Sequence, residues 1–297
     1  MIVIVNPAEA RPKVSEQLYK QIGDFYDASS NLWEKVWGEH MHHGYYGRNG
    51  SYKIERRQAQ IELIEELLAF AGIAAKSAPQ AILDVGCGIG GSSIYLADKF
   101  AAEVTGITLS PMQVSRARER AIQLGLEQKV SFQLANALVM PFADSTFDLV
   151  WSLESGEHMP NKEQFLAECY RVLKPGGKLI VATWCHRETS VVGNLTTAET
   201  KHLKEIYRVY CLPYIIALSE YKQIANSCGF GEIKTDDWST AVAPFWHEVI
   251  DSAFDFATMT ELVKAGWKTI ESALSLNLMS KGYRNGLVRY GVLTATK

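Results

Sequence analysis

The sequence is poor in cysteine and has no pattern that pairs the cysteines it does contain. The five cysteines of the 297-residue chain are odd in number and widely spaced, and none belongs to a C-x-x-C motif. This usage indicates neither a disulfide framework nor a zinc site. We therefore expect a reducing compartment.

Long apolar runs and an excess of positive charge are missing as well. No stretch approaches the roughly 18 apolar residues of a membrane-spanning helix, and the opening M-I-V-I-V-N-P is too short for a signal peptide. The formal net charge of −3 provides no basic field to hold a phosphate backbone, which disfavours nucleic acid as a partner. We expect a cytoplasmic enzyme or binding protein with a small-molecule partner, and the sequence does not indicate its oligomeric state.

The stretch A-I-L-D-V-G-C-G-I-G-G-S-S, residues 81–93, is the strongest local pattern. Ala81 to Val85 predicts a buried strand, and the glycines after it predict a tight turn that opens a helix reaching Phe100. Such a turn lets backbone amides approach a nucleotide-like ligand closely. At this point the loop fits S-adenosylmethionine (SAM) better than NAD, and a purely structural turn is a third reading.

Two further strands follow at regular spacing. Residues 103–109 predict a strand that ends in Thr108 and Leu109, and Ser110 with Pro111 predicts the start of a helix that ends near Gly125. A dinucleotide enzyme would carry an acid at the end of this strand, so Thr108 disfavours NAD. The strand at 130–135 ends at Asn136 and Ala137, which could hold an adenine edge. Asn136 as a simple turn former is the alternative.

The fourth strand, residues 147–153, leads into E-S-G-E-H-M. Glu154, Glu157 and His158 fall within five residues, which is the best candidate for acid–base chemistry in the chain. The plainer reading is that Glu154 or His158 caps the loop. Asn161 with Gln164 predicts a helix start, and L-K-P-G-G at 173–177 predicts a turn into a strand at 178–185.

Residues 38–47, G-E-H-M-H-H-G-Y-Y-G, form a second segment rich in proton-handling groups. We interpret it as a lid whose histidines line the pocket. A metal site at His40, His42 and His43, or structural hydrogen bonding by them, are the alternatives.

The remaining chain divides into a helical preface and a mixed domain. Residues 1–80 predict helices, with apolar positions Val14 to Phe25, Leu32 to Trp37 and an amphipathic helix over 54–71 that places Ile61 on its apolar side. Residues 81–297 predict the α/β domain, with insertions at about 186–218 and 240–284. Further elements are expected as helices at 196–211 and after Ser219, strands at 231–238 and 287–296, and an apolar stripe from Val263 to Leu278. Packing on the sheet is the default reading of that stripe, and a lipid surface is the alternative.

These motifs, in this order, resemble class I SAM-dependent methyltransferases. More narrowly, H-M-H-H-G-Y-Y-G, R-R-Q-A-Q, S-L-E-S-G-E-H-M-P-N-K and V-A-P-F-W resemble the γ-tocopherol methyltransferases of cyanobacteria and plastids, from about Tyr26 to Thr296. The resemblance implies a Rossmann-like, seven-stranded, mostly parallel sheet whose last strand is antiparallel, with helices on both faces. It also implies SAM as methyl donor, S-adenosylhomocysteine as product and no metal. The implied acceptor is a chromanol ring carrying an isoprenoid tail.

The resemblance also implies which residues hold SAM. Those expected to bind it are Asp84, Gly86, Cys87, Gly88, Gly90, Thr108, Leu109, Gln113, Asn136, Ala137 and Glu154. Thr108 departs from the acid that many relatives carry at the ribose, and similar enzymes with T-L-S here use the threonine and a glutamine that matches Gln113.

Methylation of a phenol at carbon requires that the neighbouring hydroxyl lose its proton. We expect Glu157 or His158 to act as base, with His43 and Tyr45 orienting the hydroxyl. The predicted reaction converts γ- and δ-tocopherol to α- and β-tocopherol in vitamin E biosynthesis. Alternatives are methylation of a prenylated quinol or an amine, an NAD-dependent oxidoreductase, and a non-catalytic SAM or lipid binder. A lipid-like acceptor also suggests peripheral contact with a photosynthetic or other inner membrane.

Overall fold

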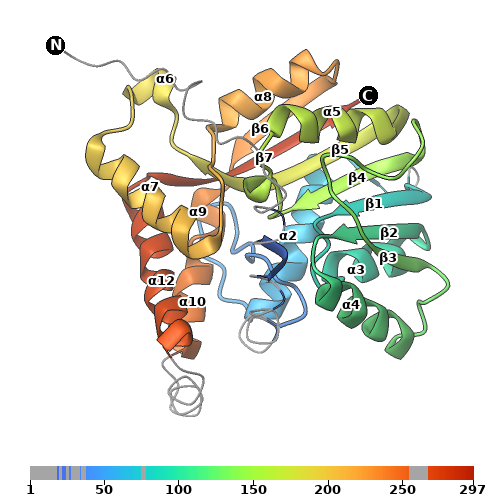
Figure 1. Ribbon diagram of the computed structural model, residues 1–297, viewed down its shortest axis with the longest axis horizontal. Coiled ribbons are helices and arrows are strands. Elements are labelled where there is room, and N and C mark those ends of the chain that lie inside the picture. Colours follow the sequence, from blue (N-terminus) through green and yellow to red (C-terminus); the bar gives the residue numbers. More distant parts are fainter. Residues whose placement is uncertain are drawn as a thin grey trace.

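The computed structural model describes residues 38–74, 78–253 and 267–297, together with positions 19, 22–24, 27 and 34. Within these ranges the chain forms one seven-stranded sheet with helices on both faces (Figure 1). The strands are β1 (Ala81–Val85), β2 (Glu103–Thr108), β3 (Val130–Leu134), β4 (Phe147–Leu153), β5 (Leu173–His186), β6 (Gly231–Asp237) and β7 (Val288–Thr296).

The described helices connect and flank these strands. They are α2 (Arg56–Phe70), α3 (Gly91–Phe100), α4 (Pro111–Gln123), the 3₁₀ turn η3 (Gly156–His158), α5 (Lys162–Val172), α6 (Thr189–Val192), α7 (Thr197–Tyr210), α8 (Leu218–Ser227), α9 (Ser239–Val242), α10 (Pro244–Ala253) and α12 (Trp267–Arg284).

The strand order is β3-β2-β1-β4-β5-β7-β6. Strands β1 to β5 pair in parallel, whereas β7 runs antiparallel to both β5 and β6. This confirms the predicted sheet with an antiparallel last strand. The chain builds outward from β1 through β2 to β3 and then returns to β4 on the other side of β1. A reversal of this kind opens a crevice at the carboxyl ends of the neighbouring strands, where ligands bind in open α/β sheets.

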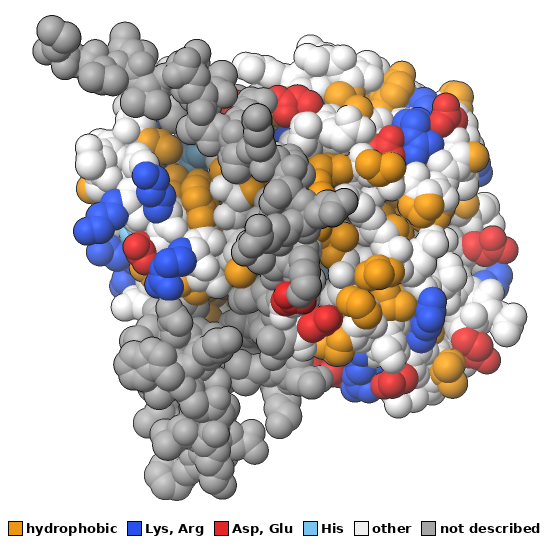
Figure 2. Space-filling view, viewed as in Figure 1, with side chains coloured by type: hydrophobic (Ala, Val, Ile, Leu, Met, Phe, Trp, Pro, Cys, Tyr) orange, Lys and Arg blue, Asp and Glu red, His pale blue; other side chains and the backbone are white. Residues whose placement is uncertain are grey.

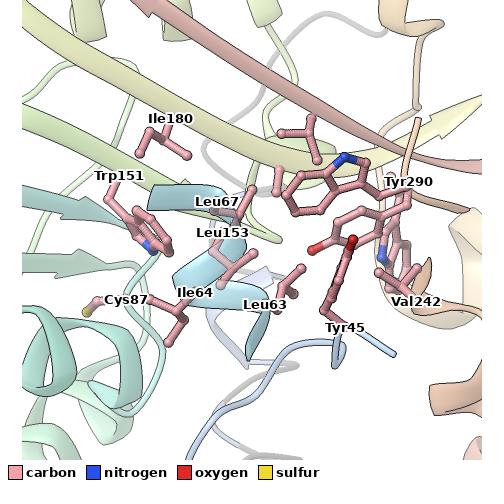
Figure 3. Packing of buried hydrophobic residues seen from close by; sticks show 14 of the residues in the cluster. Tyr45, Leu63, Ile64, Leu67, Cys87, Trp151, Leu153, Ile180, Val242 and Tyr290 are labelled. Atoms are coloured by element: carbon pink, nitrogen blue, oxygen red, sulfur yellow. The ribbon is translucent and has the colours of Figure 1, made fainter. Parts of the chain in front are cut away.

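Alternation along the strands divides the core into two layers. Ile82 and Ile180 face the layer that holds α2, α3 and α4, while the adjacent Leu83 and Val181 face the layer that holds α5 and α8. In the first layer, α2 packs on the sheet, with Leu67 near Trp151 and Ile180 (Figure 3). Because both faces are covered there, the central strands β1 and β4 are buried almost throughout, whereas the edge strand β6 is polar and mostly exposed.

Helix starts follow the predicted capping residues. The Ser110 side chain accepts a hydrogen bond from the Gln113 amide at the start of α4, and Asn161 does the same for Gln164 at the start of α5. Thr196 forms a complete capping box with Glu199 at the start of α7. These side chains satisfy amides that a helix leaves free in its first turn.

Three local predictions were wrong. Ser219 does not cap α8: the N-cap is Ala217, and the Ser219 hydroxyl donates to Glu188 instead. Strand β5 starts at Leu173 rather than residue 178, because L-K-P-G-G continues the strand through a shift in its register with β4 and a left-handed Gly176. The buried side of α2 includes Leu63 and Leu67, whereas Ile61 is only half-buried.

Some predictions fall on residues outside the described ranges. These are most of the two helices expected at residues 14–25 and 32–37, and the start of the apolar stripe at Val263. Of that stripe, Leu278 packs half-buried against the first core layer. Among the described helices, none combines the length and apolarity needed to cross a bilayer.

Candidate active site

The turn between β1 and α3 forms the first wall of the site. Gly86 and Gly88 adopt left-handed conformations, with φ of +79° and +52°, which glycine accommodates without strain. A Cβ atom at Gly86 would lie 2.2 Å from Ser155 Cβ, so only glycine fits beside the loop that follows β4. At Gly88, among the described residues, the added atom would meet only Met41 Sδ, at 3.9 Å, so a ligand can approach this side of the turn.

A cavity opens at this turn, at the carboxyl ends of the first four strands. The residues expected to bind SAM line it together, with the exception of Gly90: Asp84, Gly86, Cys87, Gly88, Thr108, Leu109, Gln113, Asn136, Ala137 and Glu154. Gly90 packs instead, since a Cβ there would lie 2.7 Å from the Phe132 ring of β3. Its role is the close approach of α3 to the sheet.

Asp84 brings a buried carboxyl to the cavity. Its Oδ2 accepts a hydrogen bond of 2.6 Å from the Ser93 hydroxyl at the start of α3. Burial raises the pKa of Asp84 to about 7. A cationic or hydrogen-bonding ligand group would favour the ionised carboxylate, because a nearby positive charge offsets the cost of burying it.

Thr108 and Gln113 lie together at the end of β2. The Thr108 hydroxyl donates to Gln113 Oε1 at 2.7 Å, and it also accepts a 3.3 Å hydrogen bond from the Ser110 amide. The pair presents a hydroxyl and an amide where dinucleotide enzymes carry an acid. Both groups suit hydroxyls such as those of a ribose.

Asn136 lines the cavity and also shapes its own turn. Its Oδ1 accepts a 2.9 Å hydrogen bond from the Leu138 amide, which is the Asx-type contact of a turn former. The turn-former reading of Asn136 therefore holds, and its place in the cavity wall holds as well.

The segment 38–44 covers the cavity from the other side. Gln60 of α2 donates to the carbonyls of His40 and His42, and Arg120 of α4 donates to the carbonyl of Glu39. Glu39, His40, Met41 and His42 thereby become part of the cavity wall. Sequence alone could identify the segment as unusual, but not the two helices that hold it.

The imidazoles of His40 and His42 are buried and neutral. Burial lowers the pKa of His40 to about 2 and lowers that of His42 as well. His42 Nδ1 lies 2.8 Å from the carbonyl of His43, to which it donates. His40 Nδ1 and His42 Nε2 have no hydrogen-bond partner among the described residues. Since His42 Nδ1 is a donor, its Nε2 can accept a hydrogen bond from a bound ligand, and His40 Nδ1 can donate or accept one according to its tautomer. The described residues contain no group of three or more His, Cys, Asp or Glu side chains placed to share a metal ion.

Of the two predicted bases, His158 lines the cavity and Glu157 does not. Burial, together with the nearby Lys162 charge, lowers the pKa of His158 to about 3. Glu157 is buried, and its Oε2 accepts a 2.7 Å hydrogen bond from the Thr183 hydroxyl of β5. Burial and the Glu154 charge raise the pKa of Glu157 to about 7.

Glu154 joins the cavity to a neighbouring cluster. It follows β4 in a left-handed conformation with φ of +53°, which is strained for a residue with a Cβ. Its Oε1 accepts from the His43 amide at 2.7 Å and from the Tyr290 hydroxyl at 2.9 Å, and its Oε2 lies 2.9 Å from His43 Nδ1. Burial alone would raise the pKa of Glu154, but the adjacent His43 outweighs it and holds that pKa below its usual value.

Tyr45 lies apart from this cluster. Its ring packs edge-on against Trp238, with centroids 5.3 Å apart, and neither Tyr45 nor His43 is among the residues that line the cavity. Of the predicted site, the structure therefore brings together His158 and the residues expected to bind SAM, apart from Gly90. His43 does not line the cavity but contacts Glu154, which does.

Comparison with known proteins agrees with this fold. A family model described as a methyltransferase domain matches residues 83–181. In solved structures, a putative sarcosine dimethylglycine methyltransferase from Galdieria sulphuraria superposes with a TM-score of 0.77 at 22% identity, covering 91% of this chain and 98% of that one. The fold and the cavity at its strand ends define a class I SAM-dependent methyltransferase.

Two plant relatives narrow this class. A probable tocopherol O-methyltransferase of Oryza sativa subsp. japonica is 48% identical over 94% of this chain and 78% of its own length. The tocopherol O-methyltransferase of Arabidopsis thaliana is 45% identical over 95% of this chain and 83% of its own length. The chain belongs to the tocopherol O-methyltransferase family.

Proposed function

We propose that this enzyme transfers the methyl group of SAM to a ring carbon of γ- or δ-tocopherol, giving α- or β-tocopherol in vitamin E biosynthesis. The observation that carries the proposal is the near full-length similarity to two tocopherol methyltransferases, combined with a cavity whose wall matches the residues expected to hold SAM.

The residues that line the cavity fit SAM in their chemistry. When bound, SAM supplies an electrophilic methyl group on a positively charged sulfur. Asp84 and the turn at Gly86 to Gly88 would hold its amino acid part, Thr108 and Gln113 its ribose, and Asn136 with Ala137 its adenine. The ionised Glu154 lies in the same wall and would favour the positive charge of the sulfonium. Cys87 and Leu109 complete the apolar parts of the wall.

The acceptor must lose a proton before its ring carbon can attack. A phenol has a pKa near 10, so a positioned base contributes about 10²–10⁴-fold at neutral pH. Glu157 and His158 are the bases that the sequence predicts, with His43 and Tyr45 expected to orient the hydroxyl. The position of His158 in the cavity wall supports it over Glu157.

The two insertions, at about 186–218 and 240–284, would enclose the isoprenoid tail. The N-terminal region 1–80 would form the lid over SAM. Each buried methylene contributes about 0.8 kcal/mol, so partial enclosure of a long tail gives ample binding energy. Helices α7, α10 and α12 of these insertions contribute Ile206, Val249 and Met279 to the first core layer.

A lipid acceptor suggests that the enzyme meets its substrate at a photosynthetic or other inner membrane. Figure 2 shows Lys and Arg side chains gathered at one edge of the molecule, on the side where Figure 1 places α7. Near the start of that helix, Val191 and Val192 of α6 are 82% and 68% exposed. Basic groups attract anionic headgroups, and exposed valines can enter the interface. In a flotation assay, the wild-type protein should float with anionic vesicles, and less of the V191D/V192D variant should do so. If the wild type floats with neither anionic nor neutral vesicles, the membrane contact is contradicted.

The direct test is transfer from SAM carrying a ¹³C-labelled methyl group, with γ-tocopherol, a prenylated quinol and an amine as parallel acceptors. We expect turnover with γ-tocopherol and a labelled carbon bonded to the aromatic ring in the NMR spectrum of the product. A label bonded to oxygen, or transfer to the quinol or the amine alone, would contradict the proposal.

A further inference from the structure

A cluster of aromatic rings adjoins the cavity at Glu154, and we call it the aromatic chamber. It surrounds the imidazole of His43, and its rings lie with centroids 4.8–6.1 Å from that imidazole. The rings belong to Trp184 of β5, Phe245 and Trp246 of α10, Tyr283 of α12 and Tyr290 of β7. Side chains from strands β5 and β7 and from helices α10 and α12 therefore enclose the imidazole of His43 together.

Three polar atoms of the chamber have no hydrogen-bond partner among the described residues although they are buried. They are His43 Nε2, Trp184 Nε1 and the Tyr283 hydroxyl oxygen. Buried polar atoms are nearly always hydrogen-bonded, because an unsatisfied one loses its interaction with water and gains nothing in return. Three of them in one cluster of rings indicate a site for a ligand that is itself aromatic and polar.

The hydrogen bonds of His43 determine which of its nitrogens can accept a proton. An ionised carboxylate only accepts hydrogen bonds, so His43 Nδ1, at 2.9 Å from Glu154 Oε2, carries the hydrogen. The other nitrogen, Nε2, then has a free lone pair. A carboxylate that fixes the tautomer and orientation of an imidazole in this way is the arrangement by which hydrolases prepare a histidine base.

We propose that the aromatic chamber binds the phenol ring of the methyl acceptor and that His43 Nε2, rather than Glu157 or His158, removes the hydroxyl proton. Glu154 and Tyr290 act as positioning residues, since Glu154 orients the imidazole and Tyr290 donates to Glu154 Oε1 at 2.9 Å. This inference rests on the proposed function, which makes the acceptor a hydroxylated aromatic ring. Trp184 Nε1 and the Tyr283 hydroxyl would bond to the oxygens of that ring.

The proton and electron balance is simple. His43 Nε2 takes the hydroxyl proton, and the electron pair of the neighbouring ring carbon forms the new bond to the methyl carbon. The bond from that methyl to sulfur breaks, and its electron pair remains on sulfur as S-adenosylhomocysteine. The ring carbon then loses its hydrogen as a proton and the imidazolium returns its proton to the oxygen, so one proton is released overall.

The inference has a structural consequence. The rings contact one another in this structure. An acceptor ring therefore enters only when helices α10 and α12 move away from the sheet. Phe245, Trp246 and Tyr283 come from the α10 and α12 pair, which lies beside β7 (Figure 1), while Trp184 and Tyr290 come from the sheet.

The first test compares H43N and H43A with wild type, using γ-tocopherol as acceptor and calorimetry with SAM. An asparagine can still donate to Glu154 but has no base, so we expect H43N to lower kcat about 100-fold or more while SAM affinity changes little. H43A should regain part of its activity when imidazole is added, which a merely structural histidine would not do. The control H186A, outside both the cavity and the chamber, should have near wild-type activity and no response to imidazole.

The second test removes the polar atom of each side chain and keeps an aromatic ring at its position. W184F and Y283F should each raise the acceptor KM about 3- to 10-fold and leave SAM affinity unchanged. A kcat for H43N within a few-fold of wild type would overturn the role of His43, and unchanged acceptor KM values in both other variants would overturn the ring site. If the wild type methylates no tocopherol at all, the proposed function fails instead.

Discussion

Gly86 and Gly72 share a left-handed backbone but differ in what surrounds them. A Cβ atom at Gly86 would meet Ser155 at 2.2 Å, whereas at Gly72, after α2, it would meet no atom of the described residues within 4 Å. We predict that G86A pushes the turn out of the cavity wall and weakens SAM binding at least tenfold, measured by calorimetry. G72A should cost only the backbone strain, about 1 kcal/mol of unfolding free energy, and leave SAM affinity unchanged. Equal affinity in G86A and wild type would contradict the proposed SAM site.

At this scale, local sequence patterns indicated which residues stand at the strand ends. Thr108 ends β2 and Asn136 follows β3, and parallel strands bring such ends to one edge, so both could be expected in the cavity wall. Asp84 was expected there from the family resemblance. The contact of Glu154 with Tyr290 could not be predicted, because it joins residues 136 positions apart and depends on the order in which β4, β5 and β7 lie in the sheet. The contact of Glu157 with Thr183 depends on the same order.

The element η3 is held in place by one buried lysine. Lys162 Nζ donates to the carbonyls of Gly156, Glu157 and Met159 at 2.8, 3.0 and 2.7 Å, and to that of Tyr214 at 3.2 Å. The lysine therefore ties the turn that carries His158 to the segment before α8.

We predict that K162M lowers the free energy of unfolding by about 2–3 kcal/mol, because the buried carbonyls lose the amino group that donates to them. Methyl transfer should fall more than SAM affinity, since the displaced turn carries His158. The matched control is K174M, which removes a half-buried ion pair with Asp148 and should cost less than about 1 kcal/mol. Denaturant unfolding of both variants measures the difference, and equal costs would contradict this role of Lys162.

The start of α7 should make stability depend on acid. Hydrogen bonds from Arg187, and from Thr196 at the helix start, lower the pKa of Glu199 to about 2. Because the folded pKa lies below the usual value of 4.5, the unfolded chain binds more protons in that window. The stabilisation is complete above pH 4.5 and is lost as the pH falls toward 2.

Substitution E199Q removes this stabilisation, so the Tm difference from wild type should be largest at pH 7 and smaller at pH 3. The control E205Q breaks an exposed pair with Arg208 on the same helix and should change Tm little at either pH. A Tm difference for E199Q that grows toward pH 3 would be inconsistent with the lowered pKa.

On the scale of the whole molecule, the order of the strands determines where the proposed SAM site and the aromatic chamber lie. The reversal of strand order at β1 and β4 places the residues expected to bind SAM, apart from Gly90, around one crevice. The antiparallel β7 then returns the chain so that Tyr290 lies beside Glu154. Alternation and capping residues made the α/β class and most element boundaries predictable from sequence. The placement of α10 and α12 was not, since their apolar residues fit a lipid surface as well as a core layer.

The measurement that tests the central claim most directly is a crystal structure with S-adenosylhomocysteine. The account predicts the amino acid part beside Asp84 and Gly86, the adenine beside Asn136 and Ala137, and the sulfur toward Glu154. A product molecule bound elsewhere, or one with its adenine at Asp84, would contradict it.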